Sequence, residues 1–189
     1  MEFEGFAKIP RLTKGFHLSE KIDGTNAQIY IGQINAEGFI GTPVDMDYDR
    51  GLFMFAGSRK RYITPEDDNF GFARWCLDNA EELYKLGPGR HFGEWFGPGI
   101  QKNPLNVSEK RLAMFNPKWI DQGPECIEVV PQLGLVTHDQ IDEALRNLYD
   151  SGTQVKGGEG EAEGIMLYHE ASQQIYKRTF HNDEGKWNE

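Results

Sequence analysis

Residues 19–30, with the sequence SEKIDGTNAQIY, place Lys21 two residues before an Asp-Gly pair and lead into an alternating apolar run. Apolar and polar residues alternate over residues 27–34, a pattern typical of a β-strand with one buried face. Asp23 and Gly24 predict a turn before this strand, because glycine permits backbone conformations that a side chain hinders. Lys21 is then either a solvated charge beside the turn or a nucleophile held at the mouth of a sheet.

Short apolar segments recur along the rest of the chain and predict a protein with many strands. A partner strand begins at Phe39 and Ile40, after the turn that follows residues 27–34. Further strands are expected at residues 52–56, 91–96, 112–115, 127–130, 165–168 and 175–176.

Two longer segments predict helices. Over residues 72–86 apolar residues recur at helical spacing, and Gly87 follows as the expected end of the helix. Thr137 and Gln140 form the pattern of a capping box at the start of a second helix, which Gly152 ends. We therefore predict an α+β fold, with antiparallel strands and two main helices in one compact domain.

Composition and charge exclude several classes of protein. The chain has 189 residues with 12 Phe, 7 Tyr and 4 Trp, which is too aromatic for a disordered chain. Its net charge of -10 argues against a protein that coats nucleic acid by bulk electrostatics, although residues 58–61 and 176–178 form local basic spots. Cys76 and Cys126 are far apart and outside any CxxC pair, so neither a zinc site nor a disulfide framework is predicted. No segment is apolar enough to span a membrane, and we expect a cytoplasmic protein.

Several short motifs follow Lys21 in a fixed order, each on or beside an expected strand. They are GSRKR at residues 57–61, FGEWFGPG at 92–99, EGIM at 163–166 and IYKR at 175–178. In this order they resemble the motifs of covalent nucleotidyltransferases, the ATP-dependent polynucleotide ligases and mRNA capping enzymes. The finer resemblance, carried by EKIDGTN and FGEWFGPGIQ, is to RNA ligases of the second type, the phage and RNA-editing ligases. It implies a nucleotidyltransferase fold, an ATP-grasp-like ligase adenylation domain of antiparallel sheets flanked by helices.

The resemblance implies that Lys21 is the residue that becomes adenylylated by ATP. A free lysine has a pKa of ~10.4, so such a nucleophile needs desolvation or a nearby cation. Lys177 is the candidate for that cation and also for a ligand of the α-phosphate. Asp23 accepts from backbone amides or orients the amine, and Ile22 is assigned to the nucleotide site.

Three further residues are assigned to the nucleotide site. The resemblance places Glu20 near the adenine edge and Arg59 at the ribose or the incoming 5′-phosphate, since arginine matches phosphate oxygens bidentately. Asn26 is either a donor to a phosphate or a simple turn residue.

The middle and last motifs supply the remaining assignments. Glu94 is a charge in an otherwise apolar strand, which must be paired or functional, and the resemblance implies that it binds the ribose hydroxyls. Phe115 is the candidate aromatic on the purine, unless Leu112 is the equivalent residue. Glu163 is expected to place a divalent metal, Mg²⁺ or Mn²⁺.

The chain departs from the family pattern at two places. The last motif is usually Lys-x-Lys, whereas here Ile175 precedes Lys177 by two residues and Arg178 follows it. Either Ile175 replaces the first lysine or Arg178 stands in for the second. The chain also ends soon after Lys177, so we expect a single adenylyltransferase domain over residues 1–189 with no OB-fold or C-terminal domain.

The implied function is an ATP-dependent RNA ligase that joins 5′-phosphate and 3′-hydroxyl ends through a lysyl-AMP intermediate, in RNA repair of a phage-like kind. A partner protein that supplies the absent domain is an open alternative. Three further alternatives are open: a DNA ligase, a GTP-dependent capping guanylyltransferase core, and a catalytically impaired module that binds nucleotide or nucleic acid. Added OB domains are usual in DNA ligases and capping enzymes, which disfavours both here.

Overall fold

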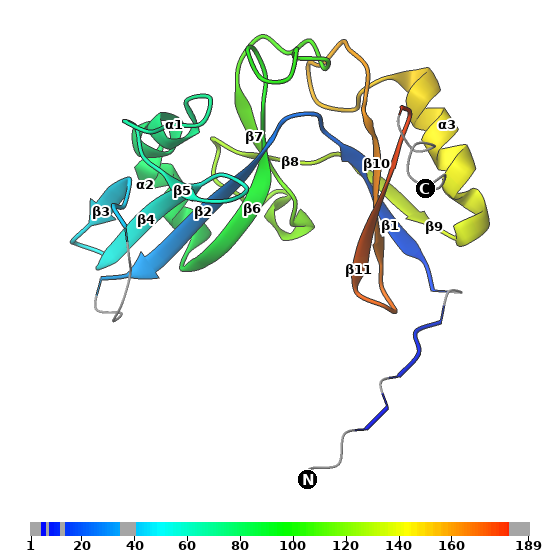
Figure 1. The fold of residues 1–189 in the computed structure, drawn as a ribbon, viewed down its shortest axis with the longest axis horizontal. Helices are drawn as coiled ribbons and strands as arrows, with labels where there is room; N and C mark the ends of the chain where they lie inside the picture. Colours follow the sequence, from blue (N-terminus) through cyan, green and yellow to red (C-terminus); the bar gives the residue numbers. More distant parts are fainter. Residues whose placement is uncertain (1–4, 7, 12–13, 35–40, 182–189) are drawn as a thin grey trace. The chain divides into compact units, whose positions relative to one another are not determined.

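The computed structural model describes residues 5–6, 8–11, 14–34 and 41–181 (Figure 1). The chain forms two compact units, which we describe one at a time. Unit 1 comprises Met1–Lys21, Pro131–Gln154 and Ala162–Glu189. Unit 2 comprises Ile22–Val130 and Val155–Glu161.

Unit 1 is a four-stranded antiparallel sheet with the strand order β11-β10-β1-β9. Its strands are β1 (Phe16–Lys21), β9 (Gln132–Val136), β10 (Gly164–His169) and β11 (Gln174–Thr179). Helix α3 (Ile141–Ser151) packs on one face, where its Ile141 and Leu148 join Leu18 of β1 in a hydrophobic cluster. We call the opposite face, which carries Lys21, the open face of unit 1.

The start and end of α3 confirm the second predicted helix. Thr137 and Gln140 form the capping box, in a short 3₁₀ turn η3 (His138–Gln140) that leads into α3. Gly152 ends the helix with a φ of 73°, a backbone conformation that favours glycine.

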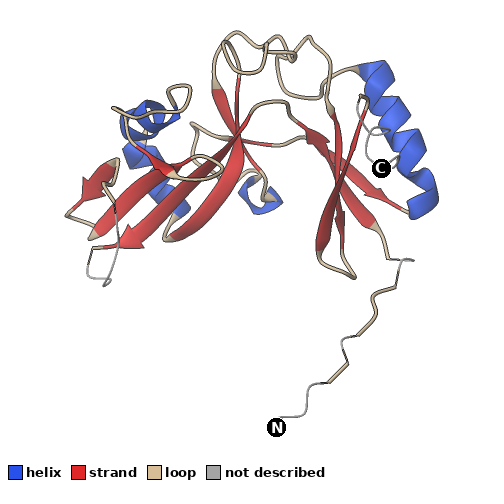
Figure 2. Cartoon of the chain, viewed as in Figure 1, coloured by secondary structure: helices blue, strands red, loops and turns tan. Residues whose placement is uncertain are grey.

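Unit 2 is a seven-stranded sheet in which β3, β4, β2, β6, β7 and β8 follow one another and β5 pairs with β4. The strands are β2 (Thr25–Gln33), β3 (Asp45–Asp47), β4 (Leu52–Gly57), β5 (Tyr62–Ile63), β6 (Gly89–Phe96), β7 (Arg111–Met114) and β8 (Glu128–Val129). All neighbours are antiparallel except β7 and β8. Figure 2 shows the dominance of strands over helices in both units.

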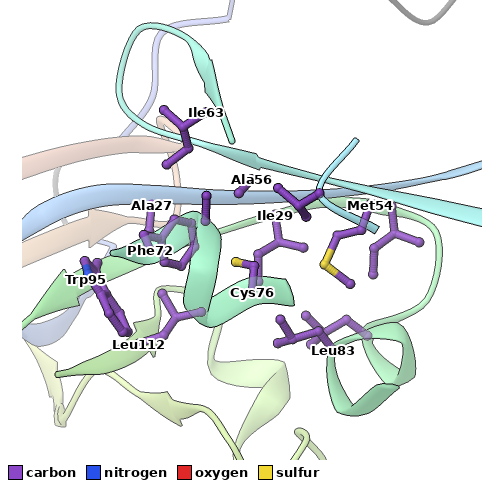
Figure 3. Packing of buried hydrophobic residues seen from close by; sticks show 14 of the residues in the cluster. Ala27, Ile29, Met54, Ala56, Ile63, Phe72, Cys76, Leu83, Trp95 and Leu112 are labelled. Atoms are coloured by element: carbon purple, nitrogen blue, oxygen red, sulfur yellow. The ribbon is translucent and has the colours of Figure 1, made fainter. Parts of the chain in front are cut away.

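The core of unit 2 lies between its sheet and the short helices α1 (Phe72–Asp78) and α2 (Ala80–Leu83). Ala27 and Ile29 of β2 alternate with polar residues and pack with Phe72 and Cys76 of α1 (Figure 3). Because alternate residues of a strand point to opposite faces, the intervening polar residues lie on the other face. We call that side the open face of unit 2.

The α+β class and the antiparallel pairing are confirmed, and the first predicted helix is in the right place but interrupted. It divides at Asn79, whose side-chain amide donates to Trp75 O (2.8 Å). Asparagine competes in this way with the helical backbone, which explains the break. The strand start predicted at Phe39 and Ile40 lies outside the described residues. No helix in the described part of the chain is long and apolar enough to cross a membrane.

Candidate active site

Lys21 and Glu163 meet at one end of the sheet of unit 1. Lys21 is the last residue of β1 and pairs in register with Gly164, so Glu163 lies directly beside it at the start of β10. The Lys21 Nζ donates to Glu163 Oε2, and their side chains are 22% and 29% exposed. The predicted nucleophile and the predicted metal carboxylate are therefore in contact and accessible to a substrate.

Lys177 lies on the same face of this sheet as Lys21. In the register, Ser19 of β1 faces Met166 of β10, and Met166 faces Lys177 of β11. Ser19 and Lys21 are alternate residues of one strand and point to the same face. Lys177, which is in register with Ser19 across β10, therefore lies on the open face one residue pair away from Lys21. Its ammonium is exposed and has no hydrogen bond or ion pair with the described residues. It is thus available to bind an anion.

The two candidates for the partner of Lys177 lie on opposite faces of β11. Ile175 shares the face of Lys177, two residues away. Arg178 points to the side of α3, where its guanidinium is 3.1 Å from the Asp142 carboxylate. Of the two, Ile175 is therefore the one that shares the face of Lys177, and its correspondence to the usual first lysine stays a prediction.

Glu20 is turned to the α3 side of β1, into the interior of unit 1. Only 1% of the residue is exposed. Its carboxylate accepts from Thr153 Oγ1 (2.5 Å) and from the backbone N–H of Gln154 (2.6 Å). Burial raises the pKa of Glu20 despite these two hydrogen bonds. In this structure Glu20 anchors the segment after α3, and its contact with adenine stays a prediction.

Replacement of Glu20 by glutamine should change the pH dependence of stability. The raised pKa means that the folded protein holds this proton more tightly than the unfolded chain. The stabilisation from this proton is complete at pH values below the pKa that Glu20 has in the unfolded chain. It is lost as the pH rises through the higher pKa that Glu20 has in the folded protein. Glutamine cannot ionise, so stability should fall less for Glu20→Gln than for wild type between about pH 4 and about pH 7. Urea unfolding of both proteins over this range measures the difference, and identical pH profiles would contradict the expectation.

Asn26 and Glu94 lie side by side on the open face of unit 2. They face each other in the register of β2 and β6, and Asn26 Nδ2 donates to Glu94 Oε2 (3.2 Å). Asn26 is therefore part of a side-chain cluster with Glu94 and is not merely a turn residue. Glu94 is half-buried.

The structure separates the two candidates for the purine platform. Leu112 faces Trp95 and is buried in the core cluster on the α1 side, as Figure 3 shows. Phe115 follows β7, faces Phe92 through a backbone hydrogen bond (3.0 Å), and lies on the face of Glu94. Only Phe115 of these two therefore presents its side chain beside Glu94.

The turn after Lys21 is shaped by close packing against β6. A Cβ on Gly24 would lie 2.5 Å from Trp95 O and 2.9 Å from the Phe96 Cβ, so no larger residue fits. This close approach, and not a left-handed conformation, explains the glycine. Ile22 is buried with Phe96 in a third cluster, and Asp23 is partly buried.

Arg59 lies in the exposed turn between β4 and β5. Its guanidinium makes no hydrogen bond or ion pair with the described residues. Arg61, two residues on, forms two hydrogen bonds with the Asp67 carboxylate (2.5 and 2.9 Å). Arg59 is accordingly the arginine of this turn that is available to a phosphate.

Sequence reasoning missed Glu128, which lies on the open face of unit 2 opposite Ala113 in the register of β7 and β8. Its carboxylate is 3.5 Å from an Arg111 terminal nitrogen, which also donates to Lys156 O (2.8 Å). Burial raises the pKa of Glu128. The signal was a charge inside an apolar strand, the same signal that identified Glu94.

The described residues contain no group of three or more His, Cys, Asp or Glu side chains placed to hold a metal ion. Mg²⁺ is commonly bound by one or two carboxylates together with substrate phosphates. Glu163 fits this mode, because one carboxylate oxygen contacts Lys21 and the other has no donor among the described residues.

The arrangement of strands and short helices in this chain is shared with an RNA ligase of known structure. No protein-family model and no curated protein matches the chain. Solved structures of one enzyme, the RNA ligase of Naegleria gruberi, do match.

The structure of that ligase with PPi aligns with a TM-score of 0.59 at 16% identity, covering 88% of this chain and 50% of that chain. The structure of a lysine-to-alanine mutant of the ligase with ATP and Mn aligns with a TM-score of 0.60 at 15% identity. This alignment also covers 88% of this chain and 50% of that chain. The structure of a glutamate-to-alanine mutant with AMP and Mn has the same TM-score of 0.60 at 15% identity, and the alignment again covers 88% of this chain and 50% of that chain. At this identity the likeness establishes the fold alone, and the chain spans about half the length of the ligase chains it matches.

Proposed function

We propose that this chain is an ATP-dependent RNA ligase that works through a lysyl-AMP intermediate. The observation that carries the proposal is the contact of the Lys21 amine with the Glu163 carboxylate at the end of β1. The fold supports it, because the solved structures that match are of an RNA ligase, and several of them were determined with ATP, AMP or PPi.

The reaction has three steps. The neutral Lys21 Nζ attacks the α-phosphorus of ATP, a phosphoramidate bond forms, and pyrophosphate leaves. An oxygen of an RNA 5′-phosphate then attacks the same phosphorus, which breaks the bond to Lys21 and leaves an activated RNA end. Finally, a 3′-hydroxyl attacks the RNA phosphate, a phosphodiester forms, and AMP leaves.

Residues of unit 1 support the chemistry at the α-phosphate. Glu163 orients the Lys21 amine through their hydrogen bond and is placed to receive its proton. Lys177 carries a positive charge on the same face and offsets the negative charge of the phosphate. A divalent metal, Mg²⁺ or Mn²⁺, would be held by Glu163 and substrate phosphates, where it would neutralise phosphate charge.

Residues of unit 2 bind the rest of the nucleotide in this proposal. Glu94 accepts hydrogen bonds from the ribose hydroxyls, and Asn26 holds its carboxylate in place (3.2 Å). Phe115 stacks on the purine. Arg59 contacts the ribose or the incoming 5′-phosphate. The proposal takes the chain as a single adenylyltransferase domain that acts on RNA in the cytoplasm.

The test is to incubate the purified protein with Mg²⁺ and α-labelled ATP or GTP, and to follow the label by denaturing electrophoresis. We expect a covalent adduct with ATP and none with GTP. Transfer of AMP to a 5′-phosphorylated RNA, followed by sealing of nicked RNA in preference to nicked DNA, would complete the assignment. Labelling by GTP would indicate a capping enzyme instead, and the absence of any adduct would leave a nucleotide-binding or nucleic-acid-binding module.

A further inference from the structure

Two large aromatic residues, Phe92 and Phe115, occupy neighbouring positions on the open face of unit 2. Phe92 is 49% exposed and Phe115 is 43% exposed. The two residues are directly opposite across β6 and the end of β7, because the Phe115 N–H donates to Phe92 O (3.0 Å). Opposite residues of antiparallel strands have Cβ atoms roughly 5 Å apart. Exposed aromatic residues at neighbouring positions present apolar surface to solvent, which is a feature of binding sites.

The purine of ATP accounts for only one of these rings. With Phe115 assigned to the purine, Phe92 has no role in the proposed nucleotide site. Phe92 alternates with Glu94 on β6, so it lies on the same face one row further along the strand. An aromatic ring left exposed beside a nucleotide site offers a stacking surface for a second base.

Polar groups suited to a nucleotide flank Phe92 on two sides. Gln28 of β2 lies directly opposite, and its side-chain amide has no hydrogen-bond partner among the described residues. An amide presents both donors and an acceptor, which matches the edge of a base. Arg90 lies two residues before Phe92 on the same face of β6. Its guanidinium is held 4.6 Å over the ring of Tyr30 and donates to Tyr62 Oη (2.9 Å).

Further positive charge lies at the neighbouring turn. Gly57 of β4 faces Gln28 in the register, and the basic turn of residues 58–61 follows Gly57 directly. Arg59 and Lys60 in this turn are exposed and make no ion pair with the described residues. In a chain with a net charge of -10, the charge of this region is thus locally suited to phosphates.

We propose that Phe92, Gln28 and Arg90 form a binding site for one nucleotide of a single-stranded RNA, beside the purine platform of Phe115. The inference rests on the proposed function, because it assigns Phe115 to ATP and takes RNA as the substrate. The base stacks on Phe92, the Gln28 amide bonds its edge, and Arg90 binds an adjacent phosphate. Neighbouring aromatics on a sheet surface bind successive bases in this way in other RNA-binding domains.

The test compares RNA affinity with lysine adenylylation in the same variants. Binding of a fluorescent, 5′-phosphorylated single-stranded RNA is measured by anisotropy without ATP, and adduct formation with ATP is measured separately. Phe92→Ala should weaken RNA binding about 5- to 100-fold, as expected for loss of one stacked base, with adduct formation unchanged. Phe92→Trp should keep the affinity, because it keeps an aromatic surface.

Phe70→Ala is the matched control. Phe70 is 47% exposed and precedes α1, which packs against the opposite face of the sheet, so its loss should leave RNA binding unchanged. Two results in Phe92→Ala would overturn the RNA site: RNA affinity equal to that of the wild type, or an equal loss of adduct formation and RNA binding. A wild-type protein that forms the adduct but does not bind RNA would also overturn it. A wild type that binds RNA through Phe92 but forms no adduct would overturn the ligase proposal and leave the RNA site standing.

Discussion

The Lys21→Ala protein is expected to form no covalent adduct with AMP under conditions in which the wild type is fully labelled. The phosphoramidate requires an amine at this position, and among the described residues of unit 1 no other amine contacts Glu163. Lys21→Arg should fail equally, because it keeps a positive charge next to Glu163 but presents a guanidinium that stays protonated. Intact mass spectrometry after incubation with ATP and Mg²⁺ measures the adduct directly.

Lys85 provides the control for this experiment. It is also a lysine paired with a glutamate, Glu82, at 2.5 Å, but it lies on the 3₁₀ turn η1 (Tyr84–Leu86) of unit 2. Lys85→Ala should therefore leave adduct formation intact. An adduct that persists in Lys21→Ala, or one that disappears in Lys85→Ala, would show that the nucleophile has been assigned incorrectly.

Removal of the carboxylate at Glu163 should have the second largest effect. Glu163→Ala removes the acceptor of the Lys21 amine and the ligand assigned to the metal, so we expect adenylylation to slow by about 10²-fold or more. Glu163→Gln should also be slow, because it keeps the shape of the side chain but loses its charge. The rate of a single turnover with excess ATP measures this effect without RNA.

Glu161 is the matched carboxylate for comparison, since it lies two residues away in the chain and is exposed to solvent. Glu161→Ala should adenylylate at the wild-type rate. Equal losses in Glu161→Ala and Glu163→Ala would indicate a general effect of negative charge in this loop and would contradict the specific role of Glu163.

The order of motifs in the sequence selected the candidate residues, but it did not indicate how they meet in the fold. Lys21 and Glu163 are 142 positions apart, and their contact depends on the antiparallel pairing of β1 with β10. Strand β1 itself was not predicted, because its alternation ends in two charged residues. One of them, Glu20, is buried through hydrogen bonds to Thr153 and Gln154, which no local pattern indicates.

The choice between Phe115 and Leu112 shows the same limit of sequence patterns. Leu112 lies on β7 and Phe115 continues the same extended chain directly after it, so two residues three apart lie on opposite faces, but the sequence alone does not say which face is open. The packing of α1 decides it, because Leu112 is in the cluster that this helix covers. Glu128 lies in a strand that was expected at residues 127–130, but no local pattern indicates that this strand pairs with β7 and brings the carboxylate to Arg111.

The central claim is that Lys21 carries AMP after reaction with ATP. Proteolytic digestion of the labelled wild-type protein, followed by peptide mapping in a mass spectrometer, tests it most directly. We expect one modified peptide, with AMP on Lys21, and no such peptide after incubation with GTP. AMP on a different residue, or no AMP on the protein with either Mg²⁺ or Mn²⁺, would contradict it.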